Sequence, residues 1–422
     1  MVITDWLIFL FYRWLALPFA IGLLKLFSGL LPDKMREVIS DRDYKNLQAL
    51  PARPIWIHAS SGEIEYAKSV IRILKNEFPQ IPILVTYFSP SAKKLIQKFP
   101  GIDLAMALPW DLSVSVEKFL NFYKPRAFLV ARTDVWPELA RNLKKREIPS
   151  VLFAATLSDQ SSRQGFFSGA LTRVALNSLT QIFCVSEEDC ENLTALSIET
   201  PIQVVGDTRF DQILHRLQYP AAVKTALKPD SNEKIWVCGS TWPEDEEFLI
   251  ESFKDWIAHD GRVILAPHEF SEERLLAFEK IFLTQGWSYE RYTLADRWSS
   301  QILLVDQIGC LQELYSWGSV AFVGGSFKDK VHSVMEPLCA GLPVLVGPYH
   351  LNNREAFQFQ HVLLSPPGLF AVNVVQSSED IRAILELSKS VATPQAALLT
   401  KVQQCSGATL SLLAWVRDQL KI

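Results

Sequence analysis

The sequence predicts an α/β protein with two doubly wound domains, and three observations carry that prediction. From residue 50 onward, short runs rich in β-branched residues alternate with amphipathic stretches, an order that favours parallel sheets with crossover helices. The alternation breaks near residues 210–233, where Tyr219-Pro220 and Lys228-Pro229-Asp230-Ser231 have turn chemistry. An apolar run at 6–31 precedes both halves and adds an N-terminal helix.

The strands expected in the first half are Ile55–His58, Ile83–Tyr87, Ala127–Val130, Val151–Ala155, Ile182–Ser186 and Ile202–Gly206. The second series comprises Ile235–Gly239, Val263–Ala266, Ile302–Val305, Val320–Gly324 and Val344–Val346. We expect two Rossmann-like domains facing a cleft, with ligands at the carboxyl ends of the strands. The predicted divisions are an anchor helix at 1–31, domains at 32–212 and 213–392, and C-terminal helices at 393–422. The last helices are expected to start at Thr393-Pro394 and again near Ala408.

Composition excludes several classes of protein. The 422 residues are 49% hydrophobic and 21% charged, as in ordinary folded domains. With 42 basic and 46 acidic residues the net charge is −4, so a strongly basic nucleic-acid-binding domain is not expected. The six cysteines form no CxxC pair, and Asp and His do not group as metal ligands, so reduced thiols and no metal site are expected. A nicotinamide-dependent oxidoreductase would need a GxGxxG loop, which the sequence lacks.

Residues 6–31 indicate a membrane element. Arg13 and Lys25 are the charged residues in this run, and the stretch between them, 14–24, is shorter than the ~20 residues that span a bilayer. Asp5 and the lack of an A-x-A-like site disfavour a signal peptide. We favour an interfacial or shallowly inserted helix with both cations at the headgroups, while a single span and a buried core helix remain alternatives. The side chains expected in the acyl boundary are Trp6, Phe9, Trp14 and Phe19.

A first polar group, His58-Ala-Ser60-Ser61-Gly62-Glu63, follows a predicted strand and opens a helix. Ser60 and Ser61 can cap that helix, and Gly62 lets a substrate approach the backbone. Glu63 would then lie in the first helical turn, where its carboxylate can deprotonate an attacking hydroxyl. The alternative is that Glu63 only complements the helix dipole.

A second group, Arg132-Thr133-Asp134-Val135-Trp136-Pro137-Glu138, also follows a strand. Asp134 could hold a sugar hydroxyl or assist a base, and the alternative is a helix-capping turn. A further group begins where the second half begins, in Gly239-Ser240-Thr241. Ser240 or Thr241 is expected to cap the next helix, whose N-terminus could bind phosphate. His268, after the next strand, could donate to phosphate or simply cap.

The most informative segment is 323–357. Gly324-Gly325 closes a strand and would let backbone amides reach an anion. His332-Ser333 precedes the helix that bears Glu336, and Asn352 and Glu355 follow in a loop-to-helix setting. So many polar residues at one sheet edge favour a sugar-nucleotide site over plain turns and caps.

These motifs together resemble a known family. IWIHASSGE, TDVWPEL, ATLSDQSSR, VVGDTRFD, GSTWPEDEE, APHEFSEER and the series GGSF, VHSVMEP, GLPVLVGP and EAF occur in this order. The order and nearly the whole chain are similar to the 3-deoxy-D-manno-octulosonic acid (Kdo) transferases of lipopolysaccharide assembly. The resemblance implies a GT-B type glycosyltransferase that moves Kdo from CMP-Kdo to a lipid A precursor. It further implies inversion, no essential metal or cofactor, and a place at the cytoplasmic face of the inner membrane.

Carried over by position, Glu63 matches the general base of the family. The donor-binding segment is matched by Gly324, Gly325, His332, Glu336, Asn352 and Glu355. We expect the phosphate charge of the leaving CMP to be held by helix N-terminal amides and by His268 or His332.

The sequence also departs from the family pattern. The family often has E-T-E where this chain has Arg132-Thr133-Asp134, which reverses a charge beside the expected acceptor site. His332-Ser333 replaces a His-Asn pair, and Pro267-His268-Glu269 replaces Pro-Arg-His. Two other functions therefore stay open: a GT-B enzyme that uses a UDP-sugar on a membrane lipid, and a non-catalytic membrane-tethered paralogue.

Overall fold

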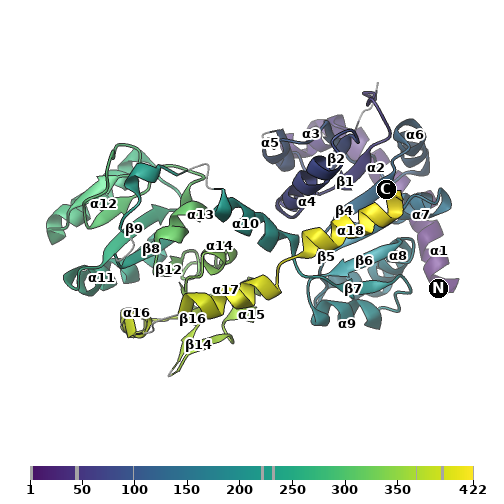
Figure 1. Cartoon of the computed structure of the whole chain (residues 1–422). Helices are drawn as coiled ribbons and strands as arrows, with labels where there is room; N and C mark the ends of the chain where they lie inside the picture. Colours follow the sequence, from purple (N-terminus) through teal and green to yellow (C-terminus); the bar gives the residue numbers. More distant parts are fainter. Residues whose placement is uncertain are drawn as a thin grey trace. The chain divides into compact units, whose positions relative to one another are not determined.

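The structure, a computed structural model, describes residues 3–42, 47–97, 99–219, 223–230, 233–366, 368–390 and 394–421. The chain divides into two compact units, Met1–Gln212 with Cys405–Ile422, and Ile213–Gln404. In the described residues each unit contains a seven-stranded parallel sheet with helices on its faces (Figure 1). The predicted fold class, two doubly wound α/β domains and an N-terminal apolar helix, is confirmed.

The sheet of the first unit has the strand order β3-β2-β1-β4-β5-β6-β7. Its strands are β1 (Ile55–His58), β2 (Ile83–Tyr87), β3 (Leu104–Ala107), β4 (Ala127–Ala131), β5 (Ser150–Ala155), β6 (Gln181–Cys184) and β7 (Ile202–Val204). The helices after β1 are α4 (Ile64–Glu77), α5 (Ser91–Gln97), α6 (Ser113–Tyr123), α7 (Pro137–Lys145), α8 (Phe166–Leu176), α9 (Glu187–Ala195) and α10 (Thr208–Gln218).

The sheet of the second unit has the order β10-β11-β9-β8-β12-β13-β16. Its strands are β8 (Ile235–Thr241), β9 (Arg262–Pro267), β10 (Tyr289–Arg291), β11 (Ile302–Leu304), β12 (Val320–Val323), β13 (Val344–Val346) and β16 (Val372–Val374). Its helices are α11 (Pro243–Ala258), α12 (Glu272–Gln285), α13 (Leu311–Leu314), α14 (Met335–Cys339), α15 (Arg354–Phe359), α16 (Ser378–Ser390) and α17 (Pro394–Gln404). A small antiparallel ribbon pairs β14 (Leu363–Ser365) with β15 (Leu369–Phe370).

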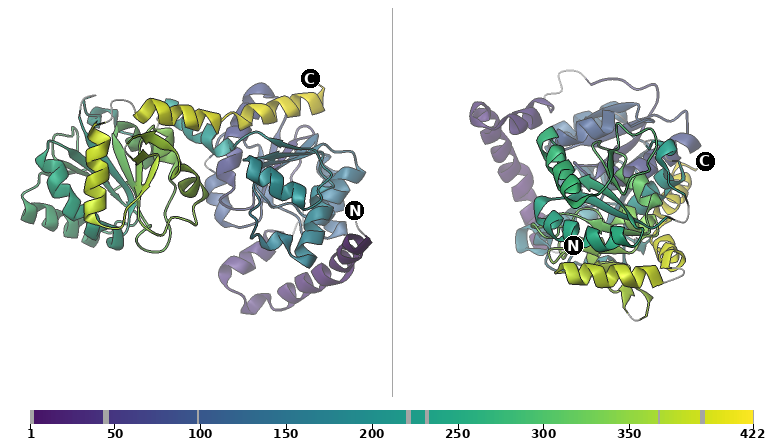
Figure 2. Two further views of the ribbon diagram at one scale, coloured as in Figure 1. Left: turned by 90° about the horizontal axis from the view of Figure 1, so that it is seen from below. Right: turned by 90° about the vertical axis from the view of Figure 1, so that its left-hand side faces the viewer.

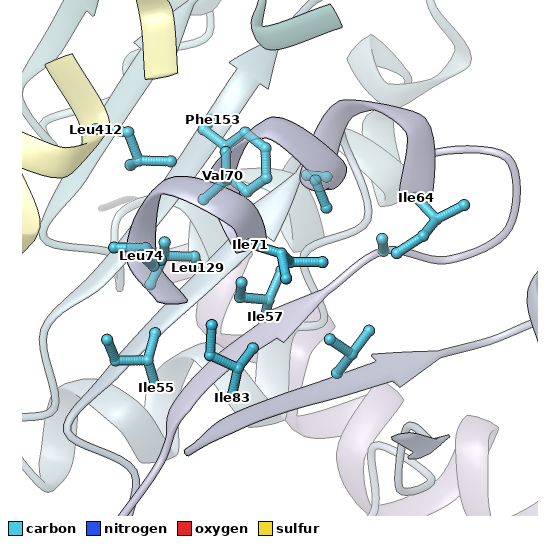
Figure 3. Close-up of a cluster of buried hydrophobic side chains, with 14 of the residues drawn as sticks. Ile55, Ile57, Ile64, Val70, Ile71, Leu74, Ile83, Leu129, Phe153 and Leu412 are labelled. Atoms are coloured by element: carbon cyan, nitrogen blue, oxygen red, sulfur yellow. The ribbon is translucent and has the colours of Figure 1, made fainter. Parts of the chain in front are cut away.

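Both faces of the first sheet are covered, and β1 shows why its sequence is apolar throughout. Ile55 and Ile57 belong to the core cluster under α4, whereas Trp56 belongs to the cluster on the opposite face. Side chains alternate between faces along a strand, so a strand covered on both sides needs a continuous apolar run. Figure 3 shows the first cluster, in which Leu412 joins side chains from α4 and the sheet.

The last helix returns to the first unit. α18 (Ala408–Leu420) packs on α4, and its N-terminus is held by Asp211 of α10, whose carboxylate accepts hydrogen bonds from the amides of Gly407 (2.6 Å) and Thr409 (2.7 Å). The predicted C-terminal segment 393–422 is therefore divided, because α17 belongs to the second unit and α18 to the first. The predicted start at Thr393 lies outside the described residues, and the predicted restart near Ala408 is where α18 begins.

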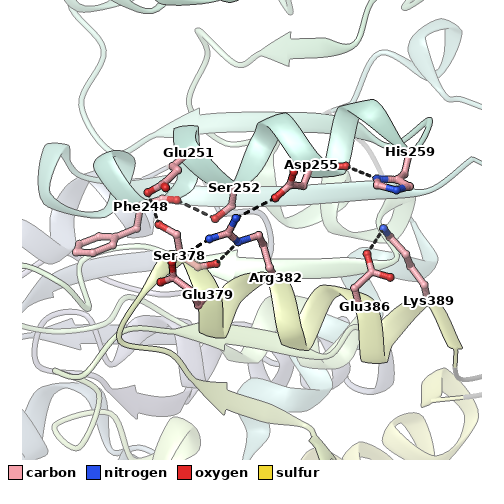
Figure 4. Close-up of polar contacts among 10 residues, drawn as sticks. All are labelled: Phe248, Glu251, Ser252, Asp255, His259, Ser378, Glu379, Arg382, Glu386 and Lys389. Atoms are coloured by element: carbon pink, nitrogen blue, oxygen red, sulfur yellow. Dashed lines mark hydrogen bonds and ion pairs between the residues drawn. The ribbon is translucent and has the colours of Figure 1, made fainter.

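In the second unit, polar contacts join α11 to α16 (Figure 4). Arg382 pairs with Asp255 at 3.3 Å, and Ser378 donates to Glu251 at 2.7 Å. α16 thereby covers the sheet face under α11, where Ile381 and Leu385 are buried. The strands β3, β10 and β16 and the ribbon were not predicted, because these short strands are only partly buried or interrupted by polar residues.

The N-terminal segment packs on the first unit through a polar face. It comprises α1 (Ile3–Phe11), the π-helical turn Tyr12–Ala16 and α2 (Leu17–Leu26), followed by α3 (Asp33–Ser40), and it is the purple segment in Figure 2. α1 lies against α8. The carboxylate of Asp5, only 1% exposed, accepts two hydrogen bonds from Arg173, at 2.5 and 2.9 Å. Ile3–Leu26 is nevertheless long and apolar enough to cross a membrane by length and composition.

Two placements expected for this segment are wrong. Arg13 is not free for a headgroup, because its guanidinium lies 3.2 Å from the buried carboxylate of Glu138 and donates to Ser113 at 2.9 Å. Phe9 is fully buried rather than available to acyl chains. The periodicity of the sequence could not predict that Phe9 and Arg13 pack on the first unit, since the elements that they contact are distant in the sequence. Trp14 and Phe19 are exposed, as expected.

The capping of α18 by Asp211 yields a stability prediction. Replacing Asp211 by Ala leaves two helix N-terminal amides without their acceptor, so the free energy of unfolding should fall by about 1–2 kcal/mol. Urea unfolding followed by circular dichroism measures this change. Asp159→Ala, at an exposed position of the same unit, is the matched control. Equal stability of both variants would contradict the role given to Asp211.

Candidate functional site

The strand order of the first sheet reverses between β1 and β4. In open parallel sheets, ligands bind outside the carboxyl ends of the strands at such a reversal. The segment after β1 carries Ser60, Ser61, Gly62 and Glu63, and the segment after β4 carries Arg132 and Asp134. Two groups that are far apart in the sequence therefore follow neighbouring strands at one sheet edge.

Asp134 joins the two segments. Its carboxylate lies 3.5 Å from Nε2 of the buried His58, whose Nδ1 donates to the backbone oxygen of Thr86 at 3.0 Å. Burial alone would raise the pKa of Asp134, but the contacts with His58 and Ser60 and the charge of Arg163 outweigh burial and lower it. Asp134 is therefore a fixed negative charge suited to holding a sugar hydroxyl or orienting a neighbour, rather than a proton donor.

Glu63 stands one residue before α4, not in its first turn as expected, and its carboxylate accepts a hydrogen bond from the amide of Ser61 at 2.7 Å. Its side chain is half-buried. Gly62 is exposed, and a Cβ built at this position has no atom within 4 Å. Packing within the chain therefore does not require glycine here.

The two serines do not cap α4, so that expectation is wrong. The hydroxyl of Ser61 lies 3.0 Å from that of Ser91, and the carbonyl of Ser60 accepts from the amides of Phe88 (2.9 Å) and Ser89 (2.8 Å). These bonds tie the loop after β1 to the loop after β2. The segment that carries Glu63 is thereby held against the loop after β2.

Arg132 adopts a left-handed backbone conformation, with φ of 69°. This conformation is uncommon for a residue with a side chain. Its guanidinium lies over the ring of Tyr66 on α4, 4.8 Å from the ring centroid. Arg163 donates to the carbonyl of Thr133. The first unit contains a cavity of about 250 Å³, and Arg132, Asp134 and Arg163 are among the residues that line it. Position 132, where the family pattern has a carboxylate, therefore carries a guanidinium that stacks on the ring of Tyr66 in the same unit.

The second sheet has its own reversal, between β8 and β12. A cavity of about 260 Å³ lies in this unit, and five predicted residues line it, namely Ser240, His268, His332, Ser333 and Glu336. Arg216, Gln312 and Tyr315 line it as well and were not predicted. Residues predicted at three separate strand ends, those of β8, β9 and β12, therefore meet in one cavity.

Three rings stack in this unit. The centroids of Trp242 and His268 are 4.7 Å apart, and those of His268 and His332 are 4.3 Å apart. The indole Nε1 of Trp242 donates to Nε2 of His332 at 2.9 Å, so the proton of a neutral His332 is on Nδ1. Lys328 lies over the indole, with Nζ 3.6 Å from its centroid.

Burial, together with the charges of His268 and Lys330, lowers the pKa of His332 to about 4. With this pKa, His332 is neutral at neutral pH. It can still donate one neutral hydrogen bond through Nδ1. The cation that lines the cavity with it is Arg216, whose guanidinium is 2.7 Å from the buried carboxylate of Glu313.

The glycine pair serves close packing rather than open anion binding. The amide of Gly324 donates to the carbonyl of Gly239 at 2.9 Å, and that of Gly325 to Asp245 at 2.7 Å. A Cβ at 324 would lie 2.2 Å from the carbonyl oxygen of Ser240, and one at 325 would lie 2.3 Å from that of Lys330. Both amides are therefore occupied, contrary to expectation, and glycine is needed because two loops approach each other.

Neither Ser240 nor Thr241 caps α11, so that expectation is wrong as well. Trp242 is the N-cap residue, and its amide donates to Asp245 at 2.9 Å. The hydroxyl of Thr241 donates to Glu246 at 2.8 Å. Asp245 and Glu246, two acidic residues in the first turn of α11, are thus engaged in hydrogen bonds within the fold.

Asn352 and Glu355 are not among the residues that line the 260 Å³ cavity. Asn352 is exposed, whereas Asn353 caps α15 by accepting from the amide of Ala356 at 2.9 Å. Asn353 also donates to the carbonyl of His332 at 3.0 Å. The family resemblance pointed to Asn352, whereas a local pattern, an Asn immediately before a helix, points to Asn353.

Other residues were missed for identifiable reasons. Arg163 is in the motif ATLSDQSSR but had no predicted role, and Arg216 lies on α10 beyond the end of the motif VVGDTRFD. Trp242 directly follows the predicted capping residues Ser240 and Thr241 and had no predicted role. Within the described part of the chain, no group of three His, Cys, Asp or Glu side chains is arranged to hold a metal ion.

Solved structures show the same fold at low sequence identity. A UDP-GlcNAc 2-epimerase from Neisseria meningitidis has a TM-score of 0.60 and 14% identity, over 85% of this chain and 98% of the other. The UDP-GlcNAc 2-epimerase from Methanocaldococcus jannaschii has a TM-score of 0.55 and 15% identity, over 82% and 98%. These likenesses concern the fold alone.

Sequence comparison is more specific. Residues 35–212, which contain the whole first sheet, match the family described as 3-deoxy-D-manno-octulosonic-acid transferase (kdotransferase). The 3-deoxy-D-manno-octulosonic acid transferase of Haemophilus influenzae is 27% identical over 82% of this chain and 83% of its own length. That of Aquifex aeolicus is 28% identical over 72% and 79%. Relatives of one name thus align along most of the chain, and the chain is similar to the 3-deoxy-D-manno-octulosonic acid transferases, which are glycosyltransferases.

Proposed function

We propose that this glycosyltransferase moves Kdo from CMP-Kdo to a lipid A precursor at the cytoplasmic face of the inner membrane. The observation that carries the proposal is the cavity of the second unit, where Ser240, His268, His332, Ser333 and Glu336 meet. At the corresponding edge of the first sheet, Glu63 supplies the base that such a transfer requires, and Asp134 supplies a fixed negative charge. The identity of the transferred sugar, Kdo, is inferred from the names of the aligned relatives.

In the proposed reaction Glu63 takes the proton of a glucosamine hydroxyl of the lipid. The oxygen of that hydroxyl forms a bond to the anomeric carbon of Kdo. The bond from this carbon to the phosphate oxygen breaks on the opposite side, and CMP leaves with the electron pair. Configuration at the anomeric carbon is inverted. Asp134 stays ionised because its pKa is lowered, and it accepts a hydrogen bond from the acceptor sugar.

The second unit holds the nucleotide. Glu336 accepts hydrogen bonds from ribose hydroxyls, and the neutral His332 donates one through Nδ1. The charge of the phosphate is met by Arg216, which is held by Glu313. A guanidinium suits this role because it stays protonated at every physiological pH.

The N-terminal segment keeps the enzyme at its lipid substrate. Apart from the docked face of α1, it exposes large apolar side chains, among them Leu7, Phe11, Trp14, Leu15 and Phe19. A helix with one face on its own domain and another apolar face exposed is suited to the boundary between headgroups and acyl chains.

Glu63→Gln should lower kcat at least about 100-fold, because the amide cannot accept the proton. Binding of CMP should be unchanged, since the nucleotide cavity belongs to the other unit. Transfer is measured by mass spectrometry of the lipid product with CMP-Kdo as donor. Glu65→Gln, two residues away and paired with Lys68, is the matched control. A kcat within a few-fold of the unmodified enzyme would remove Glu63 from the role of base.

Glu336→Gln should weaken CMP binding about tenfold or more, because a carboxylate is a stronger acceptor for hydroxyls than an amide. Thermal unfolding with increasing CMP measures the affinity. Glu379→Gln, at an exposed position on α16, should leave CMP binding unchanged. UDP in place of CMP tests the other donor class: protection by UDP alone would favour a UDP-sugar transferase, and protection by neither nucleotide would favour a non-catalytic paralogue.

The lowered pKa of His332 predicts how stability depends on pH. The unfolded chain binds a proton at this residue below about pH 6.5, whereas the folded chain does so only near pH 4. Its contribution to stability is therefore present above pH 6.5 and is lost as the pH falls toward 4. His332→Gln should flatten the unfolding free energy between these values, and the exposed His361→Gln should not. Parallel pH profiles for the enzyme and His332→Gln would refute the neutral state of His332.

A further inference from the structure

We propose that the 250 Å³ cavity of the first unit binds one acyl chain of the lipid acceptor. The inference rests on the proposed function for the identity of the lipid, and on the lining of the cavity for its chemistry. Most of that lining is apolar and comes from β5 with the segment after it, α8 and α9, including Leu152, Leu157, Leu171, Ala175 and Leu193.

The cavity has room for a chain. An apolar cavity of about 150 Å³ in another protein stays dry and admits benzene, so 250 Å³ accommodates a longer stretch of hydrocarbon. The apolar part of the lining offers no partners for ordered water, and apolar walls without a ligand forfeit dispersion contacts. A hydrocarbon ligand recovers both losses.

The polar lining residues are arranged for an amphiphile. Arg132 and Asp134 follow β4, and Arg163 follows β5, so they come from the sheet edge that also carries Glu63. A ligand with its chain among the leucines would place its polar end beside these charges. The two guanidinium groups suit a phosphate or a carbonyl at that end, and Asp134 suits a sugar hydroxyl.

The surroundings indicate a membrane lipid as the source of the chain. α8, which supplies Ser168, Leu171 and Thr172 to the cavity, begins with Phe166 and Phe167, whose side chains are 69% and 66% exposed. α1 packs against α8, and Tyr12, directly after α1, also lines the cavity. The cavity therefore adjoins the part of the unit that exposes its large apolar side chains.

The test fills the cavity and measures binding of a defined probe. Dodecanoate is titrated into the full-length protein, and binding is followed by the fluorescence of Trp136, which lines the cavity, and by calorimetry. Thr172→Phe should weaken binding at least tenfold. Thr194→Phe adds the same ring at an exposed position of α9 and should not alter binding. If Thr172→Phe fails to fold, Leu171→Trp fills the same space.

A second arm compares acceptors. Thr172→Phe should raise KM for the acylated lipid precursor at least tenfold and leave KM for its fully deacylated form within twofold. No dodecanoate binding to the unmodified protein, or binding that neither filling variant affects, overturns the proposal. Dodecanoate binding that Thr172→Phe abolishes, in a protein that transfers no Kdo, supports the cavity and refutes the proposed function. CMP-dependent thermal stabilisation, measured in parallel, reports on the other unit.

Discussion

The reversal of strand order in each sheet is the constraint on which the two candidate sites depend. It leaves two neighbouring strands, β1 and β4 in one unit and β8 and β12 in the other, whose following segments diverge to opposite sides. The space outside those strand ends is bounded by loops and helix starts rather than by a crossover. Glu63 and Asp134 occupy it in the first unit, and Ser240 and His332 occupy it in the second.

The loops at these edges are held by their own carboxylates and carbonyls, and this decides which groups remain for a ligand. Asp245 occupies amides of the glycine-rich loop, so an anion cannot use them. Glu313 fixes Arg216 and Asp134 is fixed by His58, so charges stand ready without reorganisation. The polar groups used in folding and those left for chemistry are thus different members of the same motifs.

Much of the fold could be predicted from the sequence because buried parallel strands are continuous apolar runs. Ile55–His58 and Ile83–Tyr87 have the predicted bounds, since both are fully buried and end at polar residues. β16 and β3 were missed because exposed positions interrupt their apolar character. For the sites, the motifs located the right strand ends, but hydrogen-bond partners such as Asp245 with Gly325 are 80 residues apart and leave no local pattern.

The N-terminal segment shows the same limit and links the membrane to the chemistry. Hydropathy alone could not tell that Asp5 and Arg13 form ion pairs with the first unit, because Arg173 and Glu138 belong to helices that only the fold brings near. Two paired charges turn an apolar helix into one with a fixed face on the domain. That docking brings Tyr12 to the cavity whose charged residues follow β4 and β5. One element therefore both exposes large apolar side chains and contributes Tyr12 to the cavity that we propose for an acyl chain.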